Sequence, residues 1–94
     1  MDIDAFKKTL LLNEPPAGIS IYLQALWFDA KSNWQKAHEL IQDSTDKNAY
    51  WVHAYLHRKE QDISNADYWY NKAGKQRPAC SFADEWEKIV SAFL

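Results

Sequence analysis

The sequence predicts an all-α protein of about six short helices. Only two glycines and three prolines occur in the 94 residues, and runs of β-branched residues are missing, so strands are hard to place. Apolar residues recur three and four positions apart along the chain, which is the spacing of amphipathic helices. Similar residues also recur 29 positions apart, and a period of this size predicts stacked helical hairpins. The matching pairs are Ala25/Ala54, Trp27/Leu56, Asn33/Asp62, Trp34/Ile63, Ala37/Ala66 and Ile41/Tyr70.

The first two helices are separated by a proline pair. A first helix is predicted over about residues 2–13, with one apolar stripe formed by Ile3, Phe6 and Leu10. Pro15-Pro16 then interrupts the chain, because proline removes a backbone donor and restricts the residue before it. We expect a second helix over about residues 19–31.

A capping box marks the start of the third helix. In Ser32-Asn33-Trp34-Gln35 we expect the serine hydroxyl to accept from the third backbone amide while the glutamine reaches back to the serine. The third helix is therefore predicted over about residues 33–42. A polar turn at residues 44–47 separates it from a fourth helix over about residues 48–59.

The last two helices are predicted from their ends. Ser64 is the expected N-cap of the fifth helix, which ends near Gly74, a residue suited to a left-handed C-terminal position. Ser81 is the expected N-cap of the sixth helix. The apolar positions of that helix are Phe82, Trp86, Ile89, Val90 and Phe93.

Charge and composition exclude several classes of function. The net charge is −2 and the eleven Lys and Arg residues are scattered, whereas nucleic-acid binding needs a concentrated basic face. No apolar stretch approaches the ~20 residues that span a bilayer. The first residues lack an apolar signal region, and the single cysteine, Cys80, fits a reducing compartment. We therefore expect a cytoplasmic protein that binds neither nucleic acid nor membrane.

One segment resembles a known repeat family. Asp62, Ala66, Trp69-Tyr70, Lys72-Ala73 and Pro78 fall where the second helix of tetratricopeptide and Sel1-like repeats carries such residues. The resemblance covers about residues 19–78. It implies two helical hairpins within a single domain, residues 1–94, and a role in protein–protein interaction or scaffolding.

The same segment also resembles a group of small bacterial proteins of no known activity. They share His-Ala-Tyr-Leu-His-Arg-Lys-Glu, here residues 53–60, ahead of Tyr-Trp-Tyr, here residues 68–70. The period of 29 residues is shorter than the 34 usual in tetratricopeptide repeats, and only two units are present. The first and last helices, or a second chain, must therefore cap the stack.

His53, His57 and Glu60 form one candidate site. Their spacing of four and three residues places them on one face of the fourth helix. Two imidazoles and a carboxylate form a ligand set for zinc or another divalent ion, and His38 would join them only if the fold brings the third helix close. Alternatively, both fourth-helix histidines are structural and hydrogen-bonded to a tyrosine hydroxyl or a carboxylate. A partner or small-ligand site is the third alternative.

A stripe on the opposite face of the fourth helix forms the second candidate site. It carries Trp51, Tyr55 and Arg58, which are residue types enriched in interface hot spots. The equivalent positions 29 residues earlier are occupied by Tyr22, Leu26 and Asp29. This stripe is either a partner-binding groove or core covered by a terminal helix.

The fifth helix has both a core face and an outer face. Ala66, Tyr70 and Ala73 share one face and should be core, whereas Tyr68 should reach solvent or another chain.

No enzymatic signature is present. The chain lacks a Gly-rich phosphate loop, a nucleophile elbow and a cysteine-based metal motif. The sequence therefore predicts a non-enzymatic interaction module without a cofactor that binds a protein partner or a second copy of itself as a homodimer. The alternative is a metal-binding or small-ligand-binding protein that uses His53, His57 and Glu60.

Overall fold

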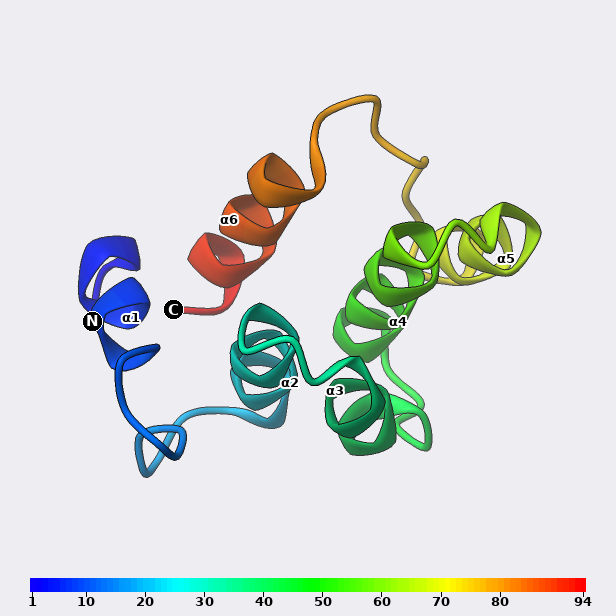
Figure 1. Cartoon of the computed structure of the whole chain (residues 1–94). Coiled ribbons are helices and arrows are strands. Elements are labelled where there is room, and N and C mark those ends of the chain that lie inside the picture. The colour runs from blue at the N-terminus through cyan, green and yellow to red at the C-terminus, as the bar shows by residue number, and fades with distance from the viewer.

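The computed structural model describes residues 1–94 as six helices with no strand (Figure 1). The predicted all-α class and helix number are therefore confirmed. The helices are α1 (Ile3–Thr9), α2 (Ile21–Ala30), α3 (Trp34–Ile41), α4 (Lys47–Lys59), α5 (Ile63–Lys72) and α6 (Phe82–Phe93).

Two helix pairs form the body of the molecule. Helix α2 packs against α3 and α4 packs against α5, and the two pairs meet through α2, α3 and α4. Helix α6 returns across α2 and α4, and α1 lies against α6, so both chain ends are on the same side of the molecule (Figure 1). None of the helices combines the length and the apolar character that crossing a membrane requires.

The turns inside the two helix pairs have the same conformation. Ser32 and Gln61 lie 29 residues apart and have φ angles of 63° and 66°, a left-handed conformation that non-glycine residues rarely adopt. The next residue in each turn donates its backbone N–H to a carbonyl five positions back, Asn33 to Phe28 at 2.9 Å and Asp62 to His57 at 3.0 Å. The repeat in the sequence therefore extends to the backbone.

Three predicted helix ends are wrong. Asn33, not Ser32, is the N-cap of α3, because the left-handed Ser32 closes the preceding turn and the Asn33 side chain accepts from the Lys36 amide at 3.1 Å. By the same turn geometry, α5 has Asp62 at its N-cap, and Ser64 lies inside the helix. In contrast, the predicted N-cap at Ser81 and the left-handed conformation of Gly74 are confirmed.

The third wrong end is that of α1, which stops at Thr9 rather than near residue 13. Side chains of α2 and of its C-cap residue donate hydrogen bonds to the backbone carbonyls at and after this end. Trp27 Nε1 donates to the Thr9 carbonyl at 3.3 Å, and Lys31 Nζ donates to the Leu10 and Leu12 carbonyls at 2.7 and 3.1 Å. The backbone continues past Thr9 as turns, with the Leu12 amide donating to the Thr9 carbonyl at 2.9 Å, and the tertiary hydrogen bonds hold this segment against α2.

Alanines allow the paired helices to approach closely. Four of them are completely buried at the positions related by the 29-residue period, namely Ala25, Ala54, Ala37 and Ala66. On α5, Tyr70 and Ala73 are also buried, as predicted, and Tyr68 is 54% exposed, as predicted. This packing fixes how α3 and α5 are placed on either side of α4.

Candidate metal centre

Three histidines converge between α3 and α4. His53 and His57 lie one turn apart on α4, and His38 reaches them from α3. One ring nitrogen from each side chain lies within 4.8 Å of the others, and the Nε2 atoms of His38 and His53 are 3.0 Å apart. The structure therefore brings together the two predicted histidines and the third that depended on the fold.

Burial keeps two of these imidazoles neutral at neutral pH. His53 is 5% exposed, and burial, together with the neighbouring His57 and His38 rings, lowers the pKa of its side chain to about 3. Burial and the proximity of His57 also lower the pKa of His38. Neutral imidazole is the form that binds a metal, so these side chains need not lose a proton to become ligands.

Two tryptophans form the walls of the histidine cluster. The Trp34 ring stacks on His38 with centroids 4.8 Å apart, and the Trp69 ring stacks on His53 with centroids 4.1 Å apart. Trp34 is itself held in place, because its Nε1 donates to the Leu56 carbonyl at 2.8 Å. Packing against the two indoles thus restricts the orientation of the His38 and His53 rings.

The hydrogen bonds of the cluster differ from those of ordinary structural histidines. The Nε2 of His53 is paired with another imidazole, His38, rather than with a tyrosine hydroxyl or a carboxylate. The Nδ1 of His57 is buried and has no hydrogen-bond partner. Buried polar atoms in proteins are nearly always satisfied, so this nitrogen lacks the partner that a structural histidine normally has.

Glu60, the third member of the predicted ligand set, lies at the edge of the cluster. Its Oε1 is 3.6 Å from His57 Nδ1, its side chain is about half exposed, and its oxygens are not among the converging donor atoms. A carboxylate at this place suits an outer position, where it accepts the second N–H of a ligating histidine. His38, rather than Glu60, therefore contributes the third converging ligand atom.

The three converging imidazole nitrogens could hold a transition-metal ion. Three nitrogens bound tetrahedrally at about 2.0–2.1 Å would lie roughly 3.3 Å from one another. The widest separation in the cluster would have to close by at most about 1.5 Å. Binding of one ion by all three nitrogens therefore requires the side chains to move toward one another.

The predicted interaction stripe lies mostly under α6. Leu26, Tyr55 and Arg58 are buried, and Trp86 of α6 donates its Nε1–H to the Leu26 carbonyl at 2.9 Å. Of the alternatives for this stripe, the structure therefore favours core covered by the terminal helix. Tyr22 and Trp51 are half-buried, and both pack against Phe93.

A buried carboxylate, Glu85, holds α6 in this place. It accepts hydrogen bonds from Arg58 Nη1 at 2.9 Å, from the Tyr70 hydroxyl at 2.7 Å and from Trp51 Nε1 at 3.4 Å. Burial and the bond to Glu85 raise the pKa of Tyr70. Sequence reasoning missed this network, because Glu85 is one of three acidic residues in the first half of α6 and no local pattern distinguishes it from the other two.

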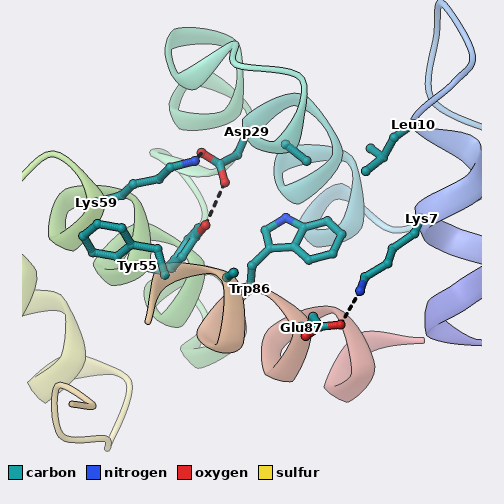
Figure 2. Close-up of a pocket in the computed structure, with 10 residues that line it drawn as sticks. Lys7, Leu10, Asp29, Tyr55, Lys59, Trp86 and Glu87 are labelled. Carbon is teal, nitrogen blue, oxygen red and sulfur yellow. Dashed lines mark hydrogen bonds and ion pairs between the residues drawn. The ribbon is translucent and has the colours of Figure 1, made fainter. Parts of the chain in front are cut away.

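A second buried carboxylate, Asp29, lies where α2 and α4 meet. It accepts from the Tyr55 hydroxyl at 2.9 Å and from Lys59 Nζ at 3.0 Å (Figure 2). Burial, and then the nearby Asp29 charge, raise the pKa of Tyr55. Sequence reasoning placed Asp29 beside the stripe without assigning it this function.

Comparisons with known proteins add no family to these observations. The chain matches no protein-family profile, no curated protein and no solved structure.

Proposed function

We propose that this protein binds a divalent transition-metal ion through His38, His53 and His57. The convergence of one nitrogen from each of these side chains, within 4.8 Å of one another, carries the proposal. Imidazole nitrogen is a preferred ligand of zinc, copper and nickel, whereas magnesium and calcium prefer oxygen. The ion would join α3 to α4.

We also propose that the fold of this chain is similar to that of tetratricopeptide repeats. The support comes from the two helix pairs and from the matching turns at Ser32 and Gln61. The binding of a protein partner or of a second copy also stays a prediction. Among the residues predicted for it, Tyr22, Trp51 and Tyr68 retain exposed area.

Zinc binding is tested on protein purified without a histidine tag. We expect elemental analysis to find bound zinc, and we expect added Zn²⁺ to raise the melting temperature of the chelator-treated protein. Zn²⁺ at 100 times its Kd would stabilise the fold by about 2.7 kcal/mol. For a chain of this size this is a rise on the order of 10 °C. Mg²⁺ should cause no rise.

Variants test whether the zinc-dependent rise in melting temperature comes from the histidine cluster. His38→Gln should abolish the zinc-dependent rise in melting temperature, because only two of the three imidazoles remain. Glu60→Gln should weaken zinc binding without abolishing it, as expected of an outer carboxylate. Glu39→Gln, an exposed neighbour on α3, is the matched control and should behave as wild type. A protein that contains no zinc and shows no zinc-dependent rise would contradict the proposal.

A further inference from the structure

A cavity of about 510 Å³ opens where α1, α2, α4 and α6 meet. Its volume falls in the range of small-molecule sites, about 300–1,000 Å³. Most of its wall is apolar and includes Leu10, Phe82, Ala83 and Trp86. It shares no residue with the histidine cluster, so an occupant would be a ligand other than the metal ion.

One end of the cavity is a fixed polar group. Asp29 is only 2% exposed, and both of its carboxylate oxygens are engaged, Oδ2 by Tyr55 and Oδ1 by Lys59. Lys59 uses one N–H on Asp29, and its side chain is 38% exposed. An ammonium group has three donors, so two remain for a ligand. Lys59 therefore offers free donors at this end, whereas each Asp29 oxygen already accepts a hydrogen bond.

The opposite end carries a second, more exposed ion pair. Lys7 of α1 is paired with Glu87 of α6, and Trp86 lies between this pair and the Asp29 group (Figure 2). Trp86 is 7% exposed, and its ring position is fixed by the hydrogen bond to the Leu26 carbonyl. The indole thus forms a rigid apolar part of the cavity wall between the two ion pairs (Figure 2).

We propose that this cavity binds a small carboxylate with an aromatic or alkyl body. The carboxylate would accept hydrogen bonds from Lys59, and the body would lie against Trp86, Phe82 and Leu10. A cationic ligand is disfavoured, because it would have to compete with Lys59 and Tyr55 for Asp29. An uncharged ligand would leave the Lys59 donors unused.

Three probes of the same shape test the charge preference. Isothermal titration calorimetry and ¹⁵N-resolved NMR would compare 3-phenylpropanoate, 3-phenylpropan-1-ol and 3-phenylpropylamine. We expect the carboxylate to bind at least tenfold more tightly than the other two, with shifts at Trp86 and Lys59. Equal binding of the three probes, or tighter binding of the amine, would overturn the proposal, as would absence of binding by the carboxylate.

Variants locate the site. Lys59→Met should weaken 3-phenylpropanoate binding at least tenfold, whereas Lys8→Met removes the same charge from an exposed position outside the cavity and should leave it unchanged. Since Lys59→Met also removes the partner of Asp29, a second variant tests the apolar wall. Ala83 is exposed, so Ala83→Trp should fill the cavity and abolish binding with the melting temperature retained. Unchanged binding in Ala83→Trp would place the ligand elsewhere.

Discussion

Glu85 shows how much of the fold can depend on one side chain. Its carboxylate joins three helices, because it accepts from Arg58 and Trp51 of α4 and from Tyr70 of α5 while belonging to α6. Arg58 also donates to the Cys80 carbonyl, which fixes the chain that leads into α6. A buried charge of this kind is tolerated only because every partner is in place.

Removal of the Glu85 charge should therefore be costly. In Glu85→Gln the Arg58 cation stays buried without a carboxylate, and we expect the free energy of unfolding to fall by about 3–5 kcal/mol. Urea unfolding followed by circular dichroism measures this loss. The control is Glu87→Gln, which breaks an exposed ion pair with Lys7 and should change stability little. Similar small losses in both variants would show that the network is not stabilising.

At the level of elements, the two matching turns explain why α3 and α5 begin where they do. A left-handed residue at Ser32 and at Gln61 turns the chain back, so that α3 lies along α2 and α5 along α4. For a non-glycine residue this conformation costs roughly 1–2 kcal/mol. The tight alanine contacts between the paired helices hold the turns in this shape.

Glycine at these two positions should relieve the backbone strain of the turns. We expect Ser32→Gly and Gln61→Gly each to raise the free energy of unfolding by a few tenths to about 1 kcal/mol, because the steric relief exceeds the added flexibility of the unfolded chain. Gln35→Gly, inside α3, is the control and should destabilise by about 1 kcal/mol. The measurement is again urea unfolding. Destabilisation by glycine at Ser32 or Gln61 would contradict this account of the turns.

At the level of the whole molecule, the histidine cluster should make the metal-free protein sensitive to acid. In the unfolded chain His53 takes up a proton near pH 6.5, whereas in the folded protein its pKa is about 3. Between these values the unfolded state binds more protons, so stability is full above pH 6.5 and falls as the pH is lowered. The loss from His53 alone is about 2 kcal/mol at pH 5.

Urea unfolding in the presence of a chelator, at pH 7 and at pH 5, measures this loss. Because carboxylates also contribute to acid sensitivity, the useful quantity is the difference between wild type and His53→Gln. We expect the variant to lose about 2 kcal/mol less than wild type over this interval. An equal loss in both proteins would show that His53 is protonated in the folded state.

The sequence predicted the fold better than it predicted the sites. Helical spacing and the 29-residue period are local properties, so the six helices and the core face at Ala66 and Tyr70 followed from them. The position of His38 depends on how α3 packs on α4, which no local pattern encodes. Glu85 and Asp29 are charged residues, and their burial depends on partners on other helices.

The tryptophan walls of the histidine cluster have a practical consequence. Trp34 and Trp69 lie face to face with His38 and His53, at centroid distances of 4.8 and 4.1 Å. An ion coordinated by His38 and His53 would therefore be separated from each of these two indoles by only one imidazole ring. The ultraviolet emission of the protein would report occupancy directly, and a paramagnetic ion such as Cu²⁺ would quench it.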